Sequence, residues 1–353
     1  MLGYTSRLLL LALLVLTAAA AAGCGSDADE AAAPPTTAGT DAAEEQLKVG
    51  LITDLGQLDD DGFNELAFKG LTRAEKELGV EGRVTESASA ADYVPNMTSL
   101  ARKGYDLIIG VGFSQGDAIG KVAQRFPEVS FAIIDVDQAF VPGKPDNVQG
   151  LLFREEEVGY LVGYLAGLAE KRRAGADVIS AVGGMKEPPV DRFIAGYRAG
   201  AEKAAPKVKL LLDYSQDWDD QAKCKELALN QIARGSGVVF QVAGGCGLGA
   251  LNAAGERKRW GIGVDADQSH LGAHILTSAQ KGVDAAVFLT IQRLLDGSFE
   301  GGGNSTFGLK EEGVGLGRVS AKVPEADVDE VERIEQQIAE GEIAGIPTEV
   351  TAG

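Results

Sequence analysis

The sequence predicts an α/β protein with two Rossmann-like, doubly wound lobes, a hinge and an interlobe cleft. Short apolar runs, typical of buried strands, alternate with segments of helical periodicity. The alternation runs to about residue 153 and restarts after a long helix predicted at 155–171. Strands that alternate with helices form parallel sheets, so two such series of similar size predict two lobes whose strand ends face one cleft.

The composition agrees with this fold class and argues against a nucleic-acid partner. Of 353 residues, 45% are hydrophobic and 6% aromatic, and the length exceeds that of one average domain. The chain has 33 Lys and Arg against 52 Asp and Glu, a net charge of −19. So acidic a chain is a poor partner for the phosphate backbone of a nucleic acid. The sequence also gives no reason to expect a cofactor.

The N-terminal residues have the pattern of a targeting segment. Arg7 precedes an apolar run at 8–16, which is too short to predict a membrane span, and a run of alanines follows. We therefore expect a signal peptide at 1–23. Residues 24–46 lack apolar periodicity and are expected to form a disordered tether. The predicted lobes are 47–154, rejoined by about 283–305, and 155–282, extended by about 306–350.

The first predicted unit is a strand at 49–52, a polar loop, and a helix that starts near Phe63. The Asp59–Asp61 run fits a helix start, where free backbone N–H groups favour carboxylates, better than a cation site, because it lacks EF-hand spacing. Asp54, Phe63 and Asn64 should lie at the carboxyl edge of the sheet, where ligands bind. The alternative is that Asp54 merely ends a strand and Phe63 belongs to the core.

The other elements follow from the same two periodicities. Asp135 again follows a buried strand, as Asp54 does. Further strands are predicted at 83–86, 106–112, 130–135, 148–153, 177–184, 208–214, 237–242, 260–264 and 275–278. Further helices are predicted at 93–102, 118–126, 155–171, 190–204, 219–233, 248–258, 283–295 and 328–340. A glycine loop is expected at 243–247.

Short motifs occur in a fixed order along the chain. They are Asp54, Gly56, Asp59, Asp60, Phe63 and Asn64; Gly183 and Gly184 with Phe193, Gly196 and Tyr197; Ala243, Gly244 and Gly247; Gly263, Val264, Asp265, Asp267 and Gln268; and Ser278 with Lys281. These motifs, in this order, resemble those of the basic membrane protein family, which are the purine-nucleoside receptor lipoproteins of ABC transporters. The resemblance covers nearly all of the chain after the tether, and it implies the type I periplasmic binding protein fold, in which hinge closure clamps the ligand. It also implies a strand pair at 307–309 and 313–316.

The resemblance also implies roles for individual residues in the cleft. Phe63 and Phe193 would sandwich a purine, and stacking of this kind contributes roughly 1–3 kcal/mol per base. Asp265 and Lys281 would hold the ribose hydroxyls, and Gly245 would let the backbone approach the sugar.

The base edge would be addressed by Asp54, Asn64 and Asp135. Taken alone, Phe193 could equally be a core residue, and Lys281 could be a solvated residue at a helix start.

The function implied is that of a substrate-binding lipoprotein, not an enzyme, which delivers a nucleoside to an ABC permease and its ATPase. The alternatives are an extracytoplasmic nucleoside-processing enzyme or a ligand-sensing receptor on the same scaffold. The sequence has no G-x-S-x-G motif, no metal-ligand cluster and no paired acid and base, which disfavours the enzyme.

The three cysteines have separate expected roles. Ala21, Ala22 and Gly23 before Cys24 resemble a bacterial lipobox, so lipidation of Cys24 would anchor the protein at the extracytoplasmic face of the membrane. The alternative is an ordinary A-x-A cleavage site. Cys224 and Cys246 are then an even pair on neighbouring elements, and an oxidising location favours a disulfide over two free thiols.

His270 and His274 are four residues apart, a spacing that binds zinc on a helix. They fall in a region predicted as loop and strand without an H-E-x-x-H pattern, so no metal site is expected.

Overall fold

Residues 46–175 and 177–351 are described by the computed structural model. The predicted signal peptide, Cys24 and all of the predicted tether except its last residue lie outside this range. Two six-stranded sheets form the frame. The first has the order β11 (Asn304–Phe307), β5 (Val148–Phe153), β4 (Ser130–Ile134), β3 (Leu107–Gly110), β1 (Lys48–Ile52) and β2 (Glu81–Thr85). The second has the order β12 (Val314–Leu316), β10 (Ile275–Lys281), β9 (Trp260–Asp265), β8 (Val238–Val242), β6 (Val178–Gly183) and β7 (Lys209–Tyr214).

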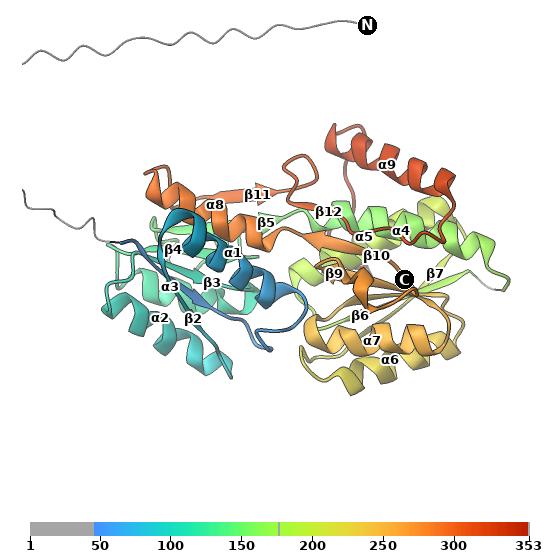
Figure 1. The fold of residues 1–353 in the computed structure, drawn as a ribbon, viewed down its shortest axis with the longest axis horizontal. Coiled ribbons are helices and arrows are strands. Elements are labelled where there is room, and N and C mark those ends of the chain that lie inside the picture. Colours follow the sequence, from blue (N-terminus) through green and yellow to red (C-terminus); the bar gives the residue numbers. More distant parts are fainter. Residues whose placement is uncertain (1–45, 176, 352–353) are drawn as a thin grey trace, which may run out of the picture. The chain divides into compact units, whose positions relative to one another are not determined.

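Neighbouring strands are parallel in both sheets, except that β10 and β12 are antiparallel. Figure 1 shows the two sheets with helices packed on them. The prediction of an α/β protein with two doubly wound lobes is therefore confirmed.

Each sheet has helices on both faces, because alternate strand residues point to opposite sides. In β3, Leu107 and Ile109 join one core cluster and Ile108 joins another. The first sheet lies between α1 (Phe63–Leu78) with α8 (Val283–Leu295) and α2 (Tyr93–Arg102) with α3 (Gly116–Ala123). The second lies between α4 (Glu155–Arg172) with α5 (Pro188–Ala204) and α6 (Gln221–Ala233) with α7 (Gly244–Glu256). The last helix, α9 (Glu325–Ala339), contacts α4.

Helices α4 and α5 approach each other through glycines. A Cβ atom on Gly159 would lie 2.4 Å from the carbonyl oxygen of Phe193, and one on Gly163 would lie 2.0 Å from that of Tyr197. Any side chain at these positions would push the helices apart. The backbone of α5, which carries Phe193, is thus packed closely against α4.

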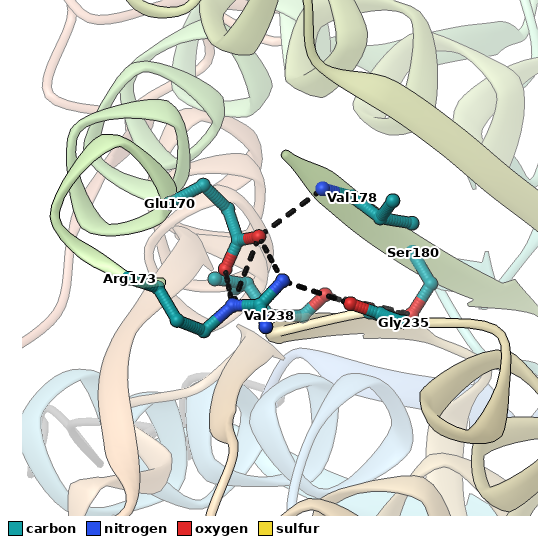
Figure 2. A network of polar contacts seen from close by, with 7 residues as sticks. Glu170, Arg173, Val178, Ser180, Gly235 and Val238 are labelled. Carbon is teal, nitrogen blue, oxygen red and sulfur yellow. Dashed lines mark hydrogen bonds and ion pairs between the residues drawn. The ribbon is translucent and has the colours of Figure 1, made fainter. Parts of the chain in front are cut away.

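A buried ion pair fixes the end of α4 to the second sheet (Figure 2). Arg173 Nη2 lies 2.7 Å from Glu170 Oε2 and donates to the carbonyl oxygen of Gly235 at 2.8 Å. The same carboxylate oxygen accepts from the backbone N–H of Val178 at 3.1 Å. Since Glu170 is 1% exposed, these partners satisfy a charge that would otherwise be costly to bury.

The described chain passes between the two sheets three times. The passages are at 153–155, between β5 and α4; at 281–283, between β10 and α8; and at 307–314, between β11 and β12. Short connections of this kind are where a two-lobed protein can bend as a hinge.

Two predictions about local structure are wrong. The strands near 307 and 314 do not pair, because β11 extends the first sheet beside β5 and β12 extends the second beside β10. The expected loop at 243–247 is mostly the first turn of α7, which begins at Gly244. Within the described ranges, no helix is long and apolar enough to cross a membrane.

Candidate ligand-binding site

All eight residues predicted to bind ligand line one cavity, which encloses about 640 Å³ of space free of protein atoms, part of it open to solvent. The first lobe contributes Asp54, Phe63, Asn64 and Asp135, and the second contributes Phe193, Gly245, Asp265 and Lys281. They meet because each lies at or just beyond the carboxyl end of a parallel strand, or on the helix that follows one.

Asp54 is a buried carboxylate with one oxygen fully engaged. Its Oδ1 accepts hydrogen bonds from Leu55 N at 2.7 Å, Tyr93 Oη at 2.6 Å and Ser114 Oγ at 2.5 Å. Burial raises the pKa of Asp54, although the bonds from Ser114 and Tyr93 oppose the shift. Its Oδ2 lies against Gly112, where a Cβ atom would come within 2.0 Å of it. That oxygen makes no hydrogen bond with any described residue, so it can accept one from a ligand.

The start of α1 positions Asn64 beside this carboxylate. Asp60 accepts hydrogen bonds from the backbone N–H groups of Gly62, Asn64 and Glu65 at 3.0, 2.9 and 3.2 Å, so this member of the acidic run caps the helix. Asn64 Oδ1 accepts from the backbone N–H of Asp54 at 3.0 Å. The amide oxygen is therefore engaged, and the Nδ2 group remains as a donor on the cavity wall.

Two aromatic rings flank the same end of the cavity. Lys281 Nζ lies 5.1 Å from the ring centroid of Phe63 and 5.9 Å from that of Phe193. Phe193 is 3% exposed, and its ring packs edge-on against Phe240. Phe193 therefore lines the cavity and also packs in the core. Phe63, the first residue of α1, is only partly buried.

Lys281 lies at the end of β10, not at a helix start, and is 2% exposed. Its Nζ donates to both oxygens of Asp135, at 2.7 and 2.8 Å, and lies 2.9 Å from Glu155 Oε1. Burial alone would lower the pKa of Lys281, but Asp135 and Glu155 together raise it above its ordinary value. The ammonium group is therefore charged and bridges the two lobes.

Asp265, at the end of β9, has no hydrogen-bond partner among the described residues and lies 9% exposed on the cavity wall. Burial raises its pKa to about 7, against the opposing effect of Lys281. Its φ of 63° is in the left-handed region, as is the φ of 70° at Asp135. Strained backbone of this kind persists where the surroundings enforce it and is common at binding sites.

The backbone of α7 forms another part of the wall, at Gly244 and Gly245. Cys246 follows in the same turn, and a disulfide joins it to Cys224 of α6, with the Cα atoms 5.6 Å apart. Cys246 N also donates to the carbonyl oxygen of Trp218 at 2.8 Å. The glycine-rich turn is thereby fixed beside the cavity.

Direct hydrogen bonds cross between the lobes next to the cavity. Gln57 N donates to Asp219 Oδ1 at 3.2 Å, and Gln268 Nε2 donates to the carbonyl oxygen of Asp61 at 3.0 Å. His270 Nε2 lies 3.2 Å from Asp61 Oδ2. The loop that follows β1 therefore contacts both loops opposite, which is the arrangement of a closed clamp.

His274 and His270 contact different residues. His274 packs against Gly255 and Gly272, whereas His270 lies beside Asp61. Throughout the described part of the chain, no group of three His, Cys, Asp or Glu side chains is placed to hold a metal ion.

Sequence reasoning missed Trp218 and Glu187, which also line the cavity. Trp218 lies in the loop after β7, and a Cβ atom on Gly184 would lie 2.2 Å from its ring. The Gly183–Gly184 pair was therefore a signal that a large side chain approaches there. Glu187 precedes α5, and nothing in its sequence neighbourhood distinguishes it from an ordinary exposed glutamate.

The comparisons with known proteins agree with this geometry. Residues 47–347 match the family described as ABC transporter substrate-binding protein, PnrA-like. The chain belongs to this family. It is 35% identical to the ABC transporter nucleoside-binding protein BmpA of Lactococcus lactis over 77% of this chain and 81% of that protein. It is 37% identical to a protein of Pyrococcus horikoshii named as a lipoprotein, over 77% and 69% of the two chains.

A solved structure with a similar fold is the solute-binding protein of an ABC transporter system from Aeropyrum pernix. It has a TM-score of 0.78 and 30% identity, and the match covers 85% of this chain and 94% of that one. The resemblance to the basic membrane protein family is thus confirmed. As an ABC transporter substrate-binding protein, the chain takes a small molecule and works with a permease, and its family consists of binding proteins, not enzymes.

Proposed function

We propose that the protein binds a purine nucleoside in the cavity between its lobes and delivers it to the ABC permease. The observation that carries the proposal is Asp265, a buried carboxylate with no hydrogen-bond partner among the described residues, beside a space flanked by Phe63 and Phe193. A flat apolar base next to a sugar with two neighbouring hydroxyls matches both features. The name of the Lactococcus lactis relative, a nucleoside-binding protein, supports the same ligand class.

Each wall of the cavity has a role in this proposal. The rings of Phe63 and Phe193 stack on the base, and Asp265 accepts hydrogen bonds from the ribose hydroxyls. Gly245 leaves room for the sugar beside the first turn of α7.

The remaining predicted residues address the rest of the ligand. Asp54 Oδ2 and the Asn64 amide face the base edge. Asp135 and Lys281 form the interlobe bridge beside the ligand, and Lys281 Nζ can donate to a ribose hydroxyl by giving up one of its two hydrogen bonds to Asp135.

Titration calorimetry tests the ligand and the ribose assignment together. Ribonucleosides should bind more tightly than 2′-deoxyribonucleosides, and Asp265→Ala should remove most of that preference. Loss of one hydrogen bond to a charged group costs about 1.5–3 kcal/mol, which is a roughly ten- to hundredfold weaker affinity. Phe63→Ala and Phe193→Ala should weaken the binding of ribonucleosides and 2′-deoxyribonucleosides alike. Asp117→Ala, at an exposed position of α3, is the control. Equal affinities for the two sugars in the wild type would overturn the ribose assignment.

The alternative of a nucleoside-processing enzyme is addressed by incubating the protein with the nucleoside and measuring released base. The binding protein should return the nucleoside intact.

We also propose that residues 1–23 are removed and that a lipid on Cys24 anchors the protein at the extracytoplasmic face of the membrane. The lipobox-like residues before Cys24 and the naming of the Pyrococcus horikoshii relative as a lipoprotein support this. Cys24→Ser should release the protein from the membrane fraction or leave it as unprocessed precursor. Normal processing and unchanged membrane partition of that variant would refute the anchor.

A further inference from the structure

We propose that Glu187 determines which base the cavity accepts, by taking hydrogen bonds from adjacent N–H donors on a guanine-type edge. The inference rests on the proposed nucleoside function and assigns a base class to the same site. Glu187 would thereby favour guanosine over adenosine.

The backbone at Glu187 is fixed while its carboxylate is free. Its N–H donates to the carbonyl oxygen of Met185 at 3.1 Å, and its own carbonyl oxygen accepts from Asp191 N at 2.9 Å. Two residues, Pro188 and Pro189, then start α5, the helix that carries Phe193. The Glu187 side chain lines the cavity and makes no hydrogen bond or ion pair with any described residue. A rigid element therefore presents an unpaired carboxylate to the ligand.

Glu187 shares its part of the cavity with other carboxylates. Asp54 and Asp135 line the same cavity, and burial, followed by the charges of these two carboxylates, raises the pKa of Glu187 to about 7. Lys281 is the ammonium group on the cavity wall, but it is engaged by Asp135 and Glu155. The free side-chain groups of the cavity wall are thus mainly carboxylate acceptors, with the Asn64 amide as a donor, so a bound base must supply donors to the carboxylates.

Purine bases differ in the donors that they offer. Guanine has adjacent N1–H and 2-amino groups, which can donate side by side to the two oxygens of one carboxylate. Hypoxanthine has only the N1–H. Adenine has a 6-amino donor next to an N1 acceptor, and a carboxylate placed against that acceptor loses the interaction. With Glu187 and the free oxygen of Asp54 at the base edge, the guanine pattern fits best.

Titration calorimetry at pH 8, where Glu187 is ionised, tests the inference with guanosine, inosine and adenosine on the wild type, Glu187→Gln and Glu187→Ala. Guanosine should bind the wild type at least about tenfold more tightly than adenosine, with inosine between them. Both variants should bind guanosine about ten- to hundredfold more weakly while their affinity for adenosine changes little. The matched control is Glu325→Gln, because Glu325 is also an acid at a helix start beside a proline but is exposed and outside the cavity.

The outcomes separate this inference from the proposed function. If the wild type binds nucleosides but prefers adenosine, or if both Glu187 variants keep the wild-type ratio of guanosine to adenosine, the role of Glu187 is wrong and the nucleoside function stands. If the wild type binds no nucleoside, both are wrong. An unchanged melting temperature in Glu187→Gln would show that any loss of guanosine affinity is not a loss of folding.

Discussion

Lys281 Nζ donates to both carboxylate oxygens of Asp135, at 2.7 and 2.8 Å, and so joins strand ends that belong to different sheets. Lys281 is 2% exposed and Asp135 6%, so neither charge has water as an alternative partner. Removing one member of such a pair leaves the other charge buried and uncompensated, which is more costly than removing both.

The Lys281–Asp135 pair can be measured by a double-mutant cycle. Lys281→Met should lower the free energy of unfolding in urea by about 3–5 kcal/mol, because Asp135 and Glu155 lose their common cation. Adding Asp135→Asn should restore part of the loss, with a coupling energy above about 1 kcal/mol. Simple additivity of the two substitutions would show that the bridge does not hold the lobes together.

Asp265 should weaken the ligand-free fold at high pH. Its pKa is about 7 in the folded protein, against an ordinary value of 3.8, so folding opposes its ionisation. The destabilisation begins as pH rises through 3.8, where the unfolded carboxyl ionises, and is complete above about 7. At pH 8 Asp265→Asn should raise the stability by up to about 4 kcal/mol, since one pKa unit equals 1.36 kcal/mol. At pH 4 its melting temperature should match that of the wild type. An equal gain in stability of Asp265→Asn at pH 8 and at pH 4 would mean that the charge of Asp265 does not destabilise the wild type.

Trp218 should report ligand binding through its fluorescence. The chain has two tryptophans, and Trp218 lines the cavity while Trp260 packs beside Lys322. A base that stacks in the cavity should change the emission of the wild type. Trp260→Phe should keep the change and Trp218→Phe should abolish it. A signal that survives in Trp218→Phe would place the ligand elsewhere.

The disulfide between Cys224 and Cys246 should contribute to stability. The two residues are 22 apart in sequence, and closing a loop of that length stabilises by about 3 kcal/mol in the chain-entropy model. The double variant Cys224→Ser/Cys246→Ser should lose about this much in urea unfolding. Non-reducing peptide mapping of the exported protein should find the two cysteines linked, and two freely alkylated thiols would contradict the bond.

The sheets were predictable because strands such as β3 and β4 are continuous apolar runs bounded by loop residues. Parallel strands also bring their carboxyl ends to one edge, so Asp54 and Asp135 of the first sheet were expected to lie at the same edge. Asp265 follows a strand of the second sheet, and the family resemblance predicted that it faces the same cleft. The start of α7 was not predictable, because glycine is a poor helix former. Its first turn is stabilised by tertiary partners instead, namely Trp218 and the disulfide.

The partners of Lys281 could not be predicted either. Glu155 is at the start of α4, where an acidic residue is usual, and nothing local shows that it is 0% exposed and faces a lysine more than a hundred positions away. The free carboxylate of Glu187 could not be predicted either, because it is free only since no neighbouring element places a donor beside it. Such features depend on how separate loops meet in space and not on any local pattern.

The strand β11 has a consequence for how the protein is made. It pairs with the edge of β5, yet it follows all five parallel strands of the second sheet in the chain. As a growing or translocating chain emerges, the N–H and C=O groups along that edge of β5 stay without their final partner until Asn304–Phe307 arrives. An unpaired edge invites pairing with other chains. The first lobe is thus the earlier one to begin folding but cannot complete its sheet until nearly all of the second lobe has been made.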